Sequence, residues 1–79
     1  MMMGGSTLEI TSPLAGEVLA VNVAPGDLVE EDQVVAVLSS MKIEIQIKAE
    51  CSGRVAEVLV TEGAVVDIGF PIIRMESNE

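Results

Sequence analysis

Few residues of this chain could do chemistry, and Lys42 is the most distinctive of them. It is one of four cationic residues in a sequence with thirteen acidic ones, and it lies between two long apolar side chains, Met41 and Ile43. A primary amine that has lost its proton is a nucleophile and can form a covalent bond with an activated acid. The alternative interpretation is an ordinary solvated cation in a surface turn.

The residue types that are missing exclude several kinds of catalysis. The sequence has no His, Trp or Tyr and a single cysteine, Cys51. Without histidine there is no usual general base, no cysteine–histidine pair and no Cys/His zinc site. The acidic run Glu30–Asp32 indicates a solvated turn, because three adjacent carboxylates rarely converge on one ion. We therefore expect no catalytic residue and no metal site, and a chain that is not an enzyme by itself.

Composition indicates one small domain built of strands. With 79 residues the chain is near the lower limit for a self-sufficient core. Its apolar share is 49%, rich in Val and Ile, which favour strands, and Phe70 is the only aromatic residue. The net charge of −9 argues against nucleic-acid binding, and no apolar run approaches the ~20 residues of a membrane span.

The ends of the chain differ in character from its middle. We expect the domain to occupy residues 8–76, with a flexible N-terminal tail at 1–7 and a polar C-terminal tail at 77–79. The first residues lack the charged and apolar regions of a signal peptide, and a lone cysteine cannot close an internal disulfide. These features favour a reducing compartment such as the cytoplasm. We expect the domain to be monomeric by itself.

An internal repeat organises the sequence. Sliding the chain by 37 positions superposes its two halves without a gap. The matched pairs are Gly16 with Gly53, Gly26 with Gly63, Val18 with Val55, Val21 with Val58, Val23 with Val60, Val29 with Val66, and Leu38 with Met75. Glycines in register with apolar positions indicate that each half forms the same set of short strands and turns.

Two such halves, each too small to bury its own apolar face, predict an all-β fold. We expect a flattened barrel or sandwich of two four-stranded antiparallel sheets with a pseudo-two-fold internal repeat, a barrel-sandwich hybrid. Ile43, Ile45 and Ile47 alternate with polar residues, which predicts a half-buried strand. The 37-residue shift maps Lys42 onto Glu79, the last residue, and onto Gly5, near the start, so Lys42 and the termini are expected at opposite poles.

Residues 38–49 read as a hairpin whose tip is Met41–Lys42. Gly, Asn and Asp, which normally supply the positive φ of a two-residue hairpin turn, are absent from this tip. A tight turn there would hold both residues in an unfavourable conformation, which is a reason to suspect function.

The residues of this tip resemble the attachment motif of biotinyl carrier domains, typically Glu-Ala/Ser-Met-Lys-Met. The chain has Ser39 where Glu is usual and Ile43 where the second Met is usual. Pro25–Val29 (Pro-Gly-Asp-x-Val) matches the same family, as does the strand opening Gly53-x-Val55. The resemblance extends from about Leu8 to Met75, and the gap-free repeat leaves no room for the "thumb" insertion of some family members.

The resemblance implies a biotin carboxyl carrier domain of the thumbless type. Lys42 would receive biotin through an amide bond from a biotin protein ligase, with Met41 and Ile43 as motif flanks. The domain would then move carboxybiotin from a biotin carboxylase to a carboxyltransferase or decarboxylase. In a eukaryotic carboxylase its location would be the mitochondrial matrix.

Two alternatives share this fold. Lipoyl carrier domains of 2-oxo acid dehydrogenase-type complexes also have a lysine at the tip, but their usual motif places Asp where this chain has Met41. Unmodified lipoyl-like hairpin domains occur in membrane-fusion and efflux adaptor proteins. Those generally lack the tip lysine and adjoin long coiled coils, and no heptads are present here.

Overall fold

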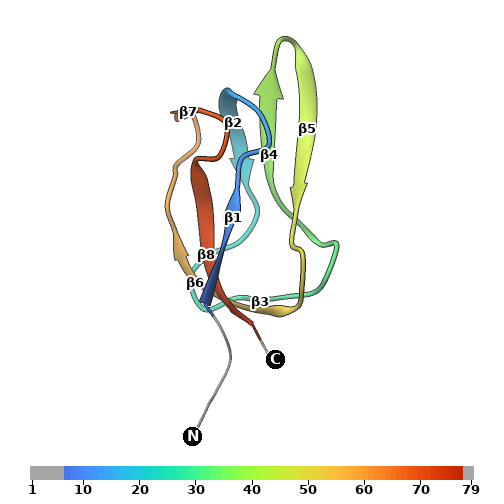
Figure 1. Cartoon of the computed structure of the whole chain (residues 1–79), viewed down its shortest axis with the longest axis vertical. Helices are drawn as coiled ribbons and strands as arrows, with labels where there is room; N and C mark the ends of the chain where they lie inside the picture. Colours follow the sequence, from blue (N-terminus) through green and yellow to red (C-terminus); the bar gives the residue numbers. More distant parts are fainter. Residues whose placement is uncertain (1–6, 78–79) are drawn as a thin grey trace, which may run out of the picture.

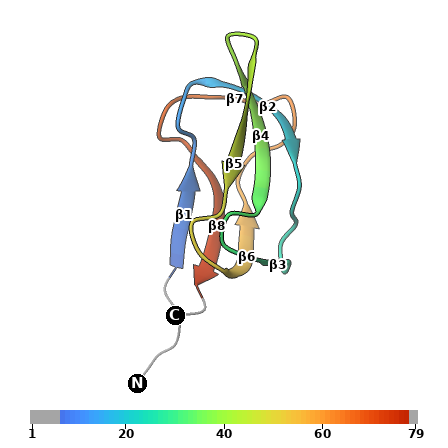
Figure 2. The same ribbon diagram turned by 90° about the vertical axis from the view of Figure 1, so that its right-hand side faces the viewer.

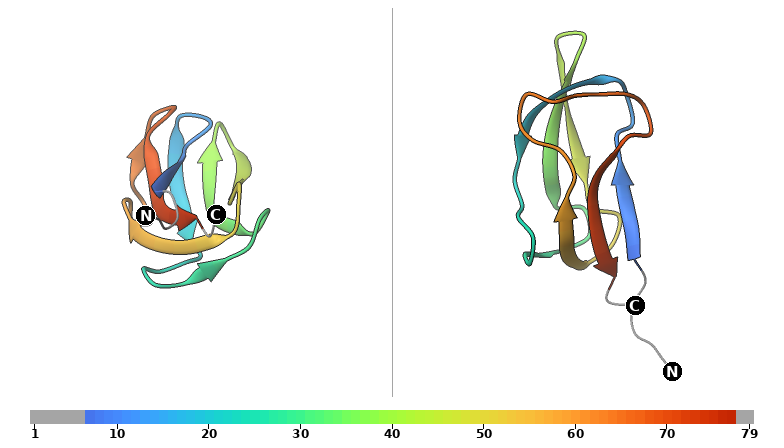
Figure 3. Two further views of the ribbon diagram at one scale, coloured as in Figure 1. Left: turned by 60° about the horizontal axis from the view of Figure 1, so that its bottom comes forward. Right: turned by 90° about the vertical axis from the view of Figure 1, so that its left-hand side faces the viewer.

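The computed structural model describes residues 7–77, which form eight β-strands arranged in two four-stranded antiparallel sheets (Figure 1). The strands are β1 (Thr7–Thr11), β2 (Gly16–Val21), β3 (Leu28–Val29), β4 (Val34–Ser40), β5 (Ile43–Lys48), β6 (Gly53–Val58), β7 (Val65–Val66) and β8 (Pro71–Ser77). One sheet has the order β1-β8-β6-β3 and the other the order β5-β4-β2-β7. Both sheets surround a common interior (Figure 3), so the predicted fold class is confirmed.

The internal sequence repeat corresponds to a repeated set of strands in the structure. Adding 37 to the bounds of β2, β3 and β4 gives those of β6, β7 and β8, and β1 falls on the last five residues of β5. Each sheet therefore takes two strands from each half of the chain. Backbone hydrogen bonds between the halves repeat as well: Gly26 N donates to Val55 O and Gly63 N to Val18 O, both at 2.8 Å.

The turns repeat with the same backbone conformation. Gly26 and Gly63 have φ of 94° and 90°, as their place in predicted tight turns requires. Asp32 takes φ of 71° at the position that Gly69, with φ of 82°, occupies in the second half. The short Asp side chain tolerates this left-handed region better than most residues do.

The interior is filled by aliphatic side chains and Met75. The buried apolar residues are Ile10, Val18, Val23, Val29, Val35, Ala36, Leu38, Ile47, Ala49, Val55, Val60, Val66, Ile72, Ile73 and Met75. Burying one Val or Ile side chain fully contributes about 1.5–3 kcal/mol, so this set accounts for a stable fold without an aromatic core. Phe70, the only aromatic residue, is 44% exposed.

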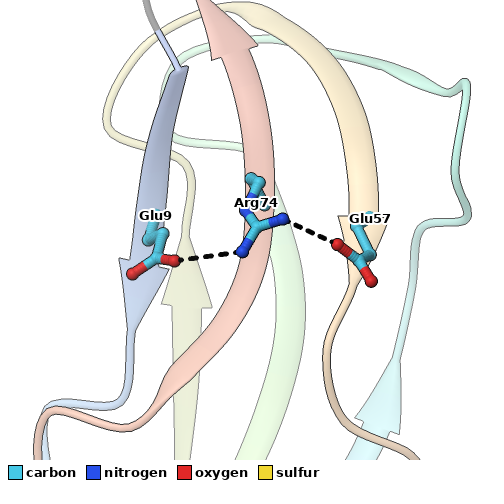
Figure 4. Close-up of polar contacts among 3 residues, drawn as sticks. All are labelled: Glu9, Glu57 and Arg74. Carbon is cyan, nitrogen blue, oxygen red and sulfur yellow. Dashed lines mark hydrogen bonds and ion pairs between the residues drawn. The ribbon is translucent and has the colours of Figure 1, made fainter.

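On the outer face of the first sheet, Arg74 links three strands (Figure 4). In β8 it lies opposite Glu9 of β1 and Glu57 of β6. Its guanidinium contacts Glu57 Oε1 at 2.8 Å and Glu9 Oε2 at 3.6 Å. All three side chains are about half exposed, so each pair contributes at most about 1 kcal/mol.

The expected boundaries need small corrections. Thr7, assigned to the N-terminal tail, is the first residue of β1, and Ser77, assigned to the C-terminal tail, is the last residue of β8. The sheet pairs Thr7 with Glu76 and Ser77 with Gly53, so backbone pairing extends past the apolar pattern. The rest of both tails, 1–6 and 78–79, lies outside the described residues. Residues 7–77 contain no helix long and apolar enough to cross a bilayer.

Two strand glycines let neighbouring strands approach closely. A Cβ on Gly16 would collide with the carbonyl oxygen of Ser39, and one on Gly53 with that of Glu76. These are the same contact in the two halves. Because the obstacle is backbone, it cannot rotate away as a side chain could.

We therefore expect Gly53→Ala to lower the free energy of unfolding by about 3 kcal/mol, measured by urea titration. Gly63→Ala is the matched control. Its Cβ would meet nothing within 4 Å, so only the positive φ opposes it, at a cost of about 1 kcal/mol. Equal losses in the two variants would contradict the close-approach explanation.

Candidate functional site

The hairpin β4–β5 ends in a two-residue turn, as predicted. Ser40 pairs with Ile43, and the turn residues Met41 and Lys42 have φ of 51° and 69°. Positive φ at both central residues is the signature of a type I′ turn, which matches the right-handed twist of the flanking strands. Glycine and asparagine normally occupy such positions, so the unfavourable conformation expected for this tip is present.

The cost of this turn is offset by the ladder behind it. A left-handed conformation at a residue with a Cβ costs roughly 1–2 kcal/mol. Pairing continues without interruption from Ser40–Ile43 through Ala36–Ile47 before a bulge at the base of the hairpin. A long ladder of backbone pairs therefore forces two unsuitable residues into the turn.

The tip is exposed on all sides. Lys42 is exposed, Met41 is 91% exposed and Ile43 is 63% exposed. Farther down the same face, Ile45 is half-buried and Ile47 is 5% exposed. The predicted alternation therefore holds at Ile45 and Ile47 and is wrong at Ile43, because the hairpin projects beyond the body of the sandwich (Figure 2).

The tip and the ends of the described chain lie at opposite poles. In Figures 1 and 2 the β4–β5 turn stands at the top, whereas β1 begins and β8 ends near the bottom. The predicted placement of the lysine is confirmed. A group attached to Lys42 would therefore be presented far from a connection made through either strand end.

The chemistry-bearing residues are not gathered around the lysine. Within residues 7–77 the ion pairs involve Arg74, not Lys42. Cys51 is half-buried in the β5–β6 connection, and Glu30–Asp32 are exposed in the β3–β4 connection, both near the opposite pole (Figure 1). In this described part no group of three His, Cys, Asp or Glu could hold a metal ion. The site is thus one accessible amine on a rigid support.

Sequence reasoning missed an apolar hollow beside β7. It has a volume of about 260 Å³ and is lined by Val58, Leu59, Val60, Thr61, Ala64, Val65, Val66 and Phe70. The sequence did contain a signal for it. The repeat places Phe70 on Gln33 and Leu59 on Asn22, so apolar residues stand where the other half has polar ones.

The strained turn generates a prediction about stability. Met41→Asn should raise the free energy of unfolding by about 0.5–1 kcal/mol, because Asn tolerates the left-handed region. Met41→Val should lower it by a similar amount, since a β-branched residue fits that region worst. Urea titration of both variants measures the change in the free energy of unfolding. A change in the same direction in both variants would contradict the turn conformation.

Comparison with known proteins gives the family. The sequence profile described as "biotin-requiring enzyme" matches residues 8–75. Over 56 residues the chain is 43% identical to the biotin carboxyl carrier protein of acetyl-CoA carboxylase from Chlamydia pneumoniae, covering 71% of this chain and 34% of that protein. It is 38% identical over 71 residues to the biotin/lipoyl attachment protein of Bacillus subtilis, covering 90% of this chain and 97% of that one.

Solved structures agree. A single-chain, multi-domain long-chain acyl-CoA carboxylase matches with a TM-score of 0.86 and 30% identity over 90% of this chain and 7% of that one. The lipoyl domain of the 2-oxoglutarate dehydrogenase complex from Azotobacter vinelandii, with a TM-score of 0.77 and 23% identity over 91% of this chain and 99% of that one, shares the fold. The chain spans about a third of the acetyl-CoA carboxylase carrier from Chlamydia pneumoniae. It belongs to the family of biotin-requiring enzymes, as a biotinyl carrier domain.

Proposed function

We propose that Lys42 is the residue to which biotin is attached. The observation that supports this most directly is the two-residue turn that holds a lysine in solvent at the pole remote from the strand ends. The residues present fit the group, because the amine is exposed and makes no ion pair within the described chain. Lys42 also matches the lysine of the family motif in register.

The attachment step uses only the side-chain amine of this chain. In the active site of a biotin protein ligase, Lys42 Nζ gives up a proton and attacks the acyl carbon of biotinyl-adenylate. AMP leaves with the electrons of the broken C–O bond, and Nζ releases a second proton as the new C–N bond becomes an amide. The product no longer has the positive charge of the lysine.

The rest of the domain presents the attached group to its partners. Biotin in such enzymes accepts a carboxyl group in one active site and releases it in another. The hairpin supports the arm, and tethering raises its local concentration at a biotin carboxylase and at a carboxyltransferase or decarboxylase without tight binding at either. The single thiol, Cys51, fits a reducing compartment, so we propose the cytoplasm, or the mitochondrial matrix in a eukaryotic carboxylase.

Met41 and Ile43 are proposed as contacts for the ligase. Both are long apolar side chains that the fold leaves largely exposed. Neither contributes a buried side chain to the core. The flexible thioether of Met41 suits contact with a partner's apolar surface.

The site assignment predicts a mass shift that depends on one residue. Co-expression with a biotin protein ligase should yield a chain heavier by one biotinyl group and retained by streptavidin, whereas Lys42→Arg should show neither effect. Lys48→Arg is the matched control, because Lys48 is the other lysine and is also exposed on β5. It should be modified like the parent chain.

Other outcomes of this experiment separate the alternatives. Modification of Lys48 in the Lys42→Arg variant would overturn the assignment. If ligases of both kinds are supplied and lipoyl is added instead of biotinyl, the result would favour a lipoyl carrier domain. If neither group is added, the result would favour the unmodified hairpin domain.

The proposed role of Met41 predicts that stability and modification change in opposite directions. Met41→Asn should fold at least as stably as the parent chain but lower the kcat/KM of biotinylation by about tenfold, the size expected for losing one buried apolar contact. Ligase kinetics on the purified chain measure the effect. Unchanged kinetics would show that the ligase does not contact this side chain.

A further inference from the structure

The outer edge of β5 is an open backbone edge. The strand stands at the end of its sheet, and β4 is the only strand in contact with it within the described chain. In Figure 1 the side of β5 away from β4 faces open space. An edge of this kind can accept another strand.

The turn determines which residues of β5 offer their backbone groups to that edge. In a two-residue hairpin the closing pair, Ser40–Ile43, is hydrogen-bonded, and bonded pairs then alternate along the ladder. At the far end Ala49 again bonds inward, since Ala49 N donates to Gln33 O and Ala49 O accepts from Asp32 N. The N–H and C=O groups of Glu44, Gln46 and Lys48 therefore point outward.

We propose that two copies of this chain associate reversibly through antiparallel pairing of their β5 strands, with Gln46 opposite Gln46. The three outward-facing residues then form three bonded pairs with about six N–H···O bonds. Glu44 of each copy lies opposite Lys48 of the other, so two opposite charges meet on each side of the axis. On the other face, the partly exposed Ile45 lies opposite Ile47 of the second copy.

The charges select this register over its neighbours. A shift in one direction places Lys48 opposite Lys42, and a shift in the other places Glu44 opposite Glu50. Both put like charges together, which destabilises a cross-strand pair. Only the register centred on Gln46 pairs every charged residue of β5 with its opposite.

The equivalent strand of the other half lacks this property. Position 46 corresponds to Glu9 in β1, so the same self-pairing would place Glu9 opposite Glu9. Glu9 is moreover engaged by Arg74 of β8. The repeat thus makes two similar edges, and the charge pattern suits only β5 for pairing with itself.

The association is expected to be weak, so it departs from the monomer expected from the sequence only at high concentration. Each copy has a net charge of −9, which opposes contact. At 0.15 M salt the Debye length is about 8 Å, so repulsion between the bodies is screened more than charge pairs in contact. Antiparallel pairing puts the two Lys42 residues eight positions apart along the strands, about 27 Å, at opposite ends of the pair.

Sedimentation equilibrium of the unmodified chain at 0.15 M salt, up to about 1 mM, tests the proposal. The parent chain should dimerise, and Glu44→Lys and Lys48→Glu should each weaken self-association by about tenfold or more. An equimolar mixture of the two variants should dimerise at least as well as the parent, because both charge pairs are restored between unlike copies. Glu44→Lys lowers the net negative charge, so its loss of association could not come from general repulsion.

A second variant tests the backbone pairing itself. Gln46→Pro removes the N–H at the axis but not a bond to β4, so the chain should keep its cooperative unfolding and lose dimerisation. A parent chain that stays monomeric throughout the range would overturn the proposal. So would single-charge variants that associate like the parent, an equimolar mixture that stays monomeric, or a folded Gln46→Pro variant that still dimerises.

Discussion

The structure depends on one shared aliphatic interior that neither half of the chain can enclose alone. Each half supplies two strands to each sheet, so every sheet exists only when both halves are present. The central strands β4 and β8 bury the equivalent residues Val35 and Ile72 completely. This mutual dependence explains how so short a chain can form a stable domain without an internal disulfide or an aromatic core.

The rigid interior is what allows an unfavourable turn at the tip. Burial of Ala36 and Ile47 anchors the base of the hairpin, and the ladder transmits that order to the turn. The turn in this way keeps the exposed Lys42 in a defined position at the end of the hairpin. For a carrier domain, that position is the useful property, because the chemistry occurs in the active sites of other proteins.

The departures from symmetry show where the two halves have different tasks. Symmetry of the fold requires apolar residues inside, and pairs such as Val18 and Val55 satisfy it. It does not require Phe70 where the other half has Gln33, or a self-complementary β5 edge where β1 has Glu9. Such differences lie on the surface, where contacts with other molecules rather than folding decide the residue type.

Much of this molecule could be predicted from local patterns in the sequence. The repeated glycines and valines indicated the number of strands and their succession along the chain, because turn conformation and the two-residue period of a strand are local properties. The same reasoning located the turn at Met41–Lys42 and the family motif around it. The tertiary structure alone decided that Ile43 is exposed while Ile47 is buried, that Phe70 borders an open hollow, and that the β5 edge is uncovered. Burial depends on which distant segments cover a residue, and the period of a strand does not contain that information.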